Sequence, residues 1–128
     1  MAGKAVRGIL AADSNVTALV SGRIYAVRAP QGATWPFITF QVIDNQPHET
    51  DNGSSAMDFV TYQVNCFAET YEGLDDLSGK VRTALDDYAG TINSVDVRQV
   101  IFQDENDLFD EDSEKAGRAL DFELSIKR

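Results

Sequence analysis

The sequence predicts an α+β fold of two layers: a mainly antiparallel sheet of about four to five strands covered by one long helix, with a short N-terminal helix. Three segments alternate between apolar and polar residues, which is typical of antiparallel strands that bury one face. A segment between them repeats apolar residues at steps of three and four, as an amphipathic helix does. A helix packed across an antiparallel sheet gives this two-layer class.

The first quarter of the chain predicts short elements. Residues 5–13 place apolar side chains at helical spacing, which predicts a short amphipathic helix. Asp13 and its polar neighbours can cap a second short helix over residues 14–22. Residues 24–27 can form a short strand, and residues 28–35, which contain a proline and a glycine, are expected to form a loop.

The alternating segments are residues 36–43, 59–68 and 117–127. In each of them the even-numbered positions are mainly apolar, so we expect these positions to face the core. The segment 95–103 is also strand-like, but its apolar residues change phase after Val97. A bulge near Arg98 and Gln99 explains the change, because one extra residue moves all later side chains to the other face.

The longest helix is predicted for residues 71–88. Thr70 can cap its start, and Gly90 follows its end. Its apolar stripe consists of Leu74, Leu77, Val81, Leu85 and Tyr88. We expect this stripe to pack against the sheet.

Length and composition indicate a single folded domain over residues 1–128, since 43% of the residues are hydrophobic and 25% are charged. No apolar run is long enough for a signal peptide or a membrane span, so we expect folding in a cytoplasm and no membrane contact. The only cysteine, Cys66, cannot form an internal disulfide and is interpreted as a core residue. The net charge of −10 argues against tight binding to nucleic acid, which requires basic residues.

Two polar segments are predicted to be long loops. Residues 44–56 join two strands but are longer than a hairpin turn requires. Residues 104–114 carry seven carboxylates among eleven residues. Loops that the fold does not require are often functional, so these two are candidates for contacts with other proteins.

No arrangement typical of an enzyme is present in the sequence, and we predict neither catalysis nor a cofactor. The only histidine, His48, precedes Glu49 and Asp51 but has too few further ligands nearby to indicate a metal site. The acidic segment 104–114 lacks the spacing of an EF-hand calcium loop. Three interpretations of it stay open: a solvated loop, a surface for a partner, and a cation site.

Five segments, in this order along the chain, together resemble a known family. They are Ala18–Tyr25 (ALVSGRIY), Ala29–Ala33 (APQGA), Trp35–Phe40 (WPFITF), Tyr62–Ala68 (YQVNCFA) and Ala119–Leu124 (ALDFEL). The succession is similar to the phage tail-completion family, which includes the tail terminators of long-tailed phages and related particles. It covers the chain from about Ile9 to Ile126. The chain departs from the family at Lys115-Ala116-Gly117, where an aromatic residue is usual.

This resemblance implies a structural virion protein that caps the tail tube as a ring, typically of six copies, and joins the tail to the neck of the head. Its implied partners are other copies of itself, the tail tube protein and a neck or connector protein. DNA is expected to pass through the channel of such a ring without specific binding. No catalysis is implied.

Two sets of residues are candidates for these contacts. The set expected to touch a neighbouring subunit or the tube consists of His48, Glu49, Asp51, Asn52, Trp35 and Arg23. The set expected to face the lumen or the neck consists of Asp104, Glu105, Asp107, Asp110, Glu111, Asp112 and Glu114. An acidic lumen repels duplex DNA over a Debye length, ~8 Å at physiological salt. Alternatively, Trp35 caps the core and Arg23 pairs with a carboxylate of its own chain.

Two other functions stay open. Another connector of the neck, a stopper or an adaptor, would share the composition and the lack of catalytic motifs. A small acidic binding protein that mimics DNA would share the negative charge. A mimic spreads its carboxylates over regular elements, however, whereas here seven are concentrated in residues 104–114.

Overall fold

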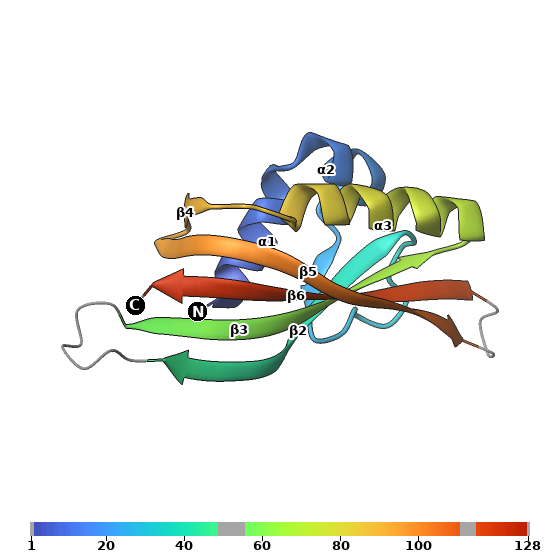
Figure 1. Cartoon of the computed structure of the whole chain (residues 1–128). Helices are drawn as coiled ribbons and strands as arrows, with labels where there is room; N and C mark the ends of the chain where they lie inside the picture. Colours follow the sequence, from blue (N-terminus) through green and yellow to red (C-terminus); the bar gives the residue numbers. More distant parts are fainter. Residues whose placement is uncertain (1, 49–55, 111–114, 128) are drawn as a thin grey trace.

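The computed structural model describes residues 2–48, 56–110 and 115–127. Its elements follow one another in the order α1 (Ala2–Ala12), α2 (Ser14–Val20), β1 (Ile24–Ala26), β2 (Phe37–His48), β3 (Met57–Ala68), α3 (Tyr71–Leu85), β4 (Gly90–Ile92), β5 (Val95–Asp110) and β6 (Lys115–Lys127) (Figure 1). The predicted α+β class is confirmed.

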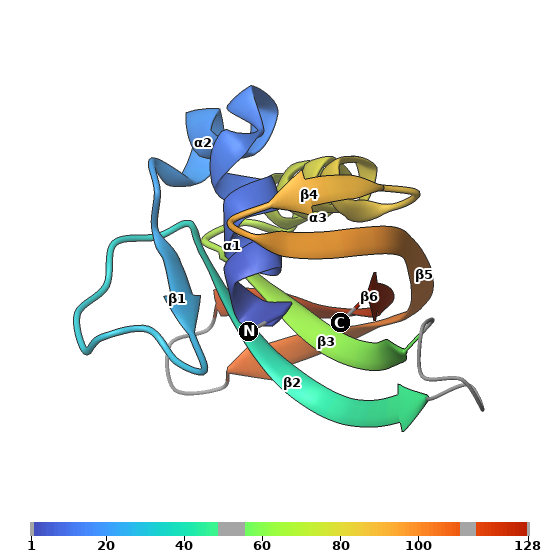
Figure 2. The same ribbon diagram turned by 90° about the vertical axis from the view of Figure 1, so that its left-hand side faces the viewer.

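In the described part of the chain, six strands form one sheet in the order β1-β2-β3-β6-β5-β4. Neighbouring strands are antiparallel except β1 and β2, which run parallel. The sheet curls strongly, and Figure 2 shows α1 inside the curve. The three helices lie on this concave side, so the convex side of the sheet has no helical cover (Figures 1 and 2).

The core lies between the concave side and the helices, and it confirms the predicted faces. Tyr62 stands opposite Phe122, and Val64 stands opposite Leu120. All four side chains are buried, with the even-numbered neighbours of the same strands. The helices contribute Val6, Ile9 and Leu10 from α1, Val16 and Val20 from α2, and Leu74, Leu77, Val81 and Leu85 from α3. The alternation therefore predicted which side of each central strand is buried.

The predicted bulge in β5 is confirmed, because the register against β6 shifts between Val97 and Gln99. The extra residue turns Val100 toward the core, where it is fully buried. Two further shifts lie between Phe102 and Asp104 in β5 and between Val42 and Asp44 in β2.

The long helix begins after Thr70, whose hydroxyl accepts a hydrogen bond from the helix start as predicted. It ends at Leu85, earlier than residue 88, because the chain turns there toward β5. Asp86 Oδ1 accepts a hydrogen bond from the backbone N–H of Phe102 at 3.2 Å. This bond attaches the end of α3 to the sheet.

The predicted number of strands and the predicted helical cover were wrong. Residues 90–92 pair with residues 95–97 as β4, which gives the described sheet six strands. A strand of three residues is too short to show alternation. The long helix does not cover the sheet alone: α3 packs on β3, β5 and β6, while α1 packs on β1, β2, β4 and β5.

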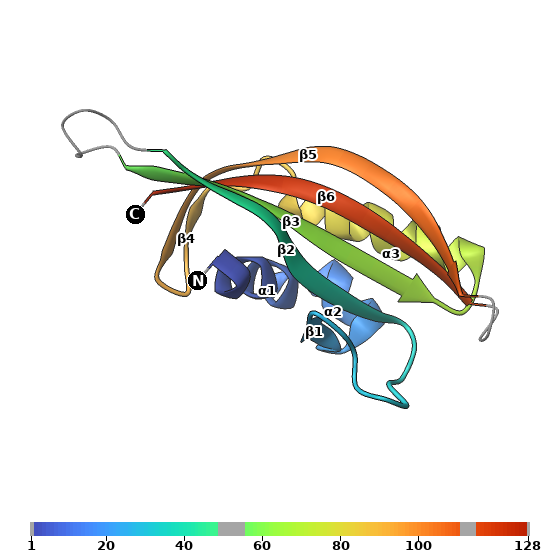
Figure 3. The same cartoon turned by 90° about the horizontal axis from the view of Figure 1, so that it is seen from below.

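The two predicted loops were also partly wrong, because much of each is strand. Residues 44–48 continue β2, and residues 104–110 continue β5. They extend two hairpins in opposite directions (Figures 1 and 3). We call residues 44–48 and 57–61 the first arm, and residues 104–110 and 115–121 the second arm. Polar, exposed residues fill the segments 44–46 and 104–107, so no apolar alternation marks them as strand.

Candidate assembly surfaces

Arg23 lies between α2 and β2 and donates hydrogen bonds to main-chain carbonyls. Its Nε lies 2.9 Å from Pro36 O, and its Nη2 lies 3.4 Å from Leu19 O. It forms no ion pair with a carboxylate of the described residues, so the predicted pairing stays a prediction only for the carboxylates outside them. Its bonds hold the end of the loop that leads into β2 close to α2.

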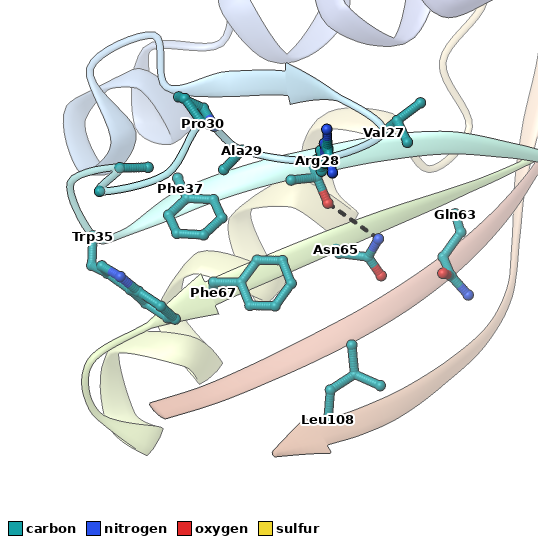
Figure 4. A pocket seen from close by; sticks show the side chains of 13 residues that line it. Val27, Arg28, Ala29, Pro30, Trp35, Phe37, Gln63, Asn65, Phe67 and Leu108 are labelled. Carbon is teal, nitrogen blue, oxygen red and sulfur yellow. Dashed lines mark hydrogen bonds between the residues drawn. The ribbon is translucent and has the colours of Figure 1, made fainter. Parts of the chain in front are cut away.

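Trp35 belongs to an aromatic cluster on the convex side of the sheet. Its ring centroid lies 4.9 Å from that of Phe37 and 5.9 Å from that of Phe67, with the rings edge to face. Phe37 stacks on Phe67 at 4.9 Å. Trp35 therefore does not cap the main core, which lies on the concave side (Figure 4). Phe37 and Phe67 are apolar residues at positions that alternation assigns to the polar face, a signal that sequence reasoning missed.

A pocket of about 470 Å³ opens beside this cluster (Figure 4). The loop after β1 forms one wall of it, and Leu108 of the second arm lies on the opposite side. Asn65 Nδ2 donates to Thr39 Oγ1 at 3.2 Å. Asn65 Oδ1 is buried and has no hydrogen-bond partner among the described residues. Aromatic walls with a few polar groups are typical of binding pockets.

A buried arginine ties the second arm to α3. Arg118 of β6 is 6% exposed. Its Nε lies 2.6 Å from Asp107 Oδ1, and its Nη1 lies 2.6 Å from Asp75 Oδ1. Its further partners are Tyr71 and Ser78 on α3, through hydrogen bonds of 3.0 and 2.9 Å, and Glu105 on β5 at 3.7 Å.

These contacts stabilise the charged forms of Asp107 and Arg118 in the second arm. The hydrogen bond from Arg118 lowers the pKa of Asp107 below its ordinary value. The same bond raises the pKa of Arg118, although burial of the guanidinium opposes the shift. Glu105 and Asp107, which were expected to face the lumen or the neck, lie on the concave side, where the positive charge of Arg118 offsets part of their negative charge. Sequence reasoning missed Arg118, which occupies a core-facing position of a predicted strand.

The middle of the convex side is acidic. Asp104 stands opposite Asp121, and Asp44 and Glu123 both lie in the next row of the same side, one on each side of Thr61. Gln63 Nε2 donates to Asp121 Oδ1 at 3.3 Å and so fixes one of these carboxylates. In the set expected to face the lumen or the neck, the described side chains are those of Asp104, Glu105 and Asp107. Of these three, Asp104 lies on this acidic surface.

Two of the remaining predicted contact residues end described strands. The backbone of His48 ends β2, and that of Asp110 ends β5. Six others fall outside the described residues: Glu49, Asp51, Asn52, Glu111, Asp112 and Glu114.

Three further observations concern the chemistry of the described residues. Cys66 is fully buried, as predicted, and burial raises the pKa of its thiol to about 12, so it is a poor nucleophile. Over residues 2–48, 56–110 and 115–127, no three His, Cys, Asp or Glu side chains are grouped to hold a metal ion. No helix in these ranges is long and apolar enough to cross a membrane.

Comparisons with known proteins agree with this fold. A solved structure from the virion of a native gene transfer agent particle superposes with a TM-score of 0.74, over 96% of this chain and 92% of that chain. The two sequences are 14% identical, so the likeness concerns the fold. No curated protein is significantly similar in sequence. The model of one protein family, tail completion protein gp17, matches residues 4–127.

The family match spans all the surfaces described above, from α1 to the end of β6. Its members are structural proteins of phage tails, which places this protein in the tail of a virion. The chain belongs to the tail completion protein gp17 family.

Proposed function

We propose that copies of the protein form a closed ring that caps the tail tube and joins the tail to the neck of the head. Membership of the tail completion family supports a position at the end of the tube. The observation that carries the ring is the pair of arms that point in opposite directions (Figure 1). A chain of 14.1 kDa is too small to enclose a channel for duplex DNA, so several copies must surround it. The resemblance found in the sequence favours six.

In this proposal the convex side of the sheet faces the channel. Asp44, Asp104, Asp121 and Glu123 give its middle a negative charge. Carboxylates on the wall repel the phosphates of passing DNA, whereas basic residues would bind them and release counterions. The acidic residues beyond β5, including Glu111, Asp112 and Glu114, belong to the same proposed lumen or to the surface that meets the neck. The role requires no catalysis.

Trp35 and the first arm are the proposed contacts with the tail tube or a neighbouring subunit. The ring of Trp35 is half-buried beside an apolar pocket, so a partner side chain could complete its burial. Arg23 donates a hydrogen bond to the carbonyl of Pro36 and so helps to position the neighbouring Trp35. His48, Glu49, Asp51 and Asn52 belong to the proposed contact at the end of the first arm.

Electron microscopy of particles made without the protein tests this function. A cap that stops tube growth and then joins the head predicts heads separated from tails, with tubes of variable and excessive length. Supplying the wild-type protein should restore complete virions. Normal virions without the protein would contradict the proposal. Tails of normal length beside leaking heads would instead indicate a stopper of the neck.

A further inference from the structure

Each edge of the sheet is covered over only part of its length. β1 pairs with β2 at Ile38–Phe40, and within the described structure residues 41–48 of β2 pair with β3 alone. At the other edge, β4 and the end of α3 cover β5 as far as Phe102. Residues 103–110 of β5 then pair with β6 alone in the described structure. Backbone N–H and C=O groups of alternate residues therefore face outward along both open segments, as they do on any unpaired edge, although Pro47 has no N–H to donate.

Exposed apolar side chains lie on these open segments. Val42 and Ile43 on β2 are 53% and 50% exposed, and Leu108 on β5 is 41% exposed. The central strands β3 and β6 expose no large apolar side chain in their described residues. Natural edge strands are normally protected against pairing by charge, cover or shortness. Exposed apolar residues on an uncovered edge instead favour the addition of another strand.

We propose that copies of the chain join edge to edge, with residues 41–48 of one copy paired antiparallel to residues 103–110 of the next. The inference rests on the proposed ring. β2 and β5 run in opposite directions within one sheet, because three successive antiparallel pairs separate them. A neighbour displaced within the plane of the sheet therefore presents its β2 to β5 in the antiparallel direction.

The placement of the arms makes this contact heterologous. The open segment of β2 extends along the first arm, and that of β5 extends along the second arm, which points the opposite way (Figures 1 and 3). Each copy would overlap its first arm with the second arm of the next. Two different surfaces then meet at every contact, which is the arrangement that closes into a ring when the rotation permits.

Full overlap of the open segments predicts a register. Ile43 is the bulge residue of β2, so it is skipped in the pairing. The other residues of 41–48 then pair with residues 104–110, an overlap of about 24 Å at ~3.4 Å per residue. Gln46 then lies opposite Asn106, and Asp44 lies opposite Leu108. All four face the convex side in their own subunits, so the sheets join with matching faces.

Arg118 reduces the charge that would oppose this contact. Glu105 and Asp107 lie within the open segment of β5, but both contact the guanidinium of Arg118 on the concave side. On β2, Asp44 Oδ2 accepts a hydrogen bond from Gln46 Nε2 at 2.8 Å. The two edges can therefore approach each other with part of their negative charge offset.

Cysteine cross-linking of the full chain tests the pairing. The variant Gln46→Cys/Asn106→Cys places one thiol on each open segment, and directly opposite residues on paired strands are close enough for a disulfide. Within one chain these positions lie on opposite arms, so an internal disulfide is not possible (Figure 1). Native Cys66 is buried and does not compete. Mild oxidation should give a ladder of covalent multimers that ends at the subunit number of the ring.

Matched variants and a ring assay by electron microscopy decide the outcome. Gln46→Cys alone and Gln46→Cys/Lys80→Cys, whose second thiol lies on the exposed face of α3, should give no covalent multimers. If electron microscopy shows rings of Gln46→Cys/Asn106→Cys but oxidation gives no covalent multimers, the pairing is overturned and the ring function is left intact. Dimers of Gln46→Cys alone would also overturn it, because like edges would then meet. A protein that forms neither rings nor multimers would contradict both proposals.

Hydrogen exchange of the wild-type protein gives a second test that needs no substitution. Within residues 41–46 and 103–108, the amides whose N–H points away from β3 or β6 should exchange at least about tenfold more slowly in assembled rings than in dilute monomer. The amides of β3, already paired on both sides, should change little. Equal exchange rates of the edge amides in the two states would overturn the inference even if the cysteine variant did not fold.

Discussion

Arg118 and Asp107 join the two strands of the second arm, with Arg118 Nε at 2.6 Å from Asp107 Oδ1. The same guanidinium reaches Asp75 on α3, so one side chain holds the arm, the central strand β6 and the helix together. Its planar fork of donors suits several carboxylates at once. The direction of the second arm relative to the helices therefore depends on this residue.

Replacing Arg118 with methionine should destabilise the protein by about 2 kcal/mol, because a buried cation with several hydrogen bonds is lost while its acceptors remain. Thermal unfolding followed by circular dichroism measures the change. Asp76→Asn is a matched control, since its ion pair with Lys80 is exposed and should contribute little. Equal melting temperatures for Arg118→Met and wild type would contradict the role of this cluster.

Stability should fall at acid pH partly through Asp107. Its pKa is lowered in the folded protein, so its contribution is fully present above its unfolded pKa of about 3.9. The contribution is lost as the pH falls through the lower folded pKa. Melting curves of wild type and Asp107→Asn should therefore differ at pH 7 and converge at acid pH, where Asp107 is protonated in both the folded and the unfolded state. A difference that stays constant over this range would contradict the assigned ion pair.

The packing face of α3 can be tested at Val81, which is fully buried in the middle of the helix. Val81→Asp should unfold the protein, because an unpaired buried carboxylate costs several kcal/mol, comparable to half the stability of a small domain. Thr83→Asp adds the same group to the exposed face of the helix and should remain folded. Wild-type melting behaviour of Val81→Asp would contradict this face.

Much of the fold could be predicted because burial leaves a pattern in the sequence. The even positions around Val64 and Phe122 are apolar since the helices cover that side, and the phase change after Val97 revealed the bulge. The arms could not be predicted in this way. Residues 44–46 and 104–107 are exposed, so hydrogen bonding keeps them in strands without any apolar pattern.

The surfaces were harder to predict because they depend on neighbours that are distant in sequence. Arg118 contacts Asp75 and Asp107 only after β6 has paired with β5 beneath α3. The carboxylates of residues 104–107 were predicted as one acidic set. In the structure, strand alternation places Asp104 on the convex side and Glu105 and Asp107 on the concave side.

The proposed lumen predicts how the protein responds to DNA. Wild type should not bind duplex DNA at physiological salt, because its net charge is −10 and the middle of its convex side carries carboxylates. The variant Asp104→Lys/Glu123→Lys should bind measurably, with an affinity that falls steeply as salt rises. Fluorescence anisotropy of a labelled duplex gives both results. Tight binding by wild type would contradict an acidic channel wall.

The most direct test of the account is cryo-electron microscopy of the purified protein mixed with tail tubes that lack it. The proposed function predicts one closed ring at one end of each tube, with a central channel wide enough for duplex DNA. The acidic convex sides, with Asp104 and Asp121, should line that channel. Binding along the sides of the tubes, or no binding to tube ends, would contradict the proposal that the protein caps the tail.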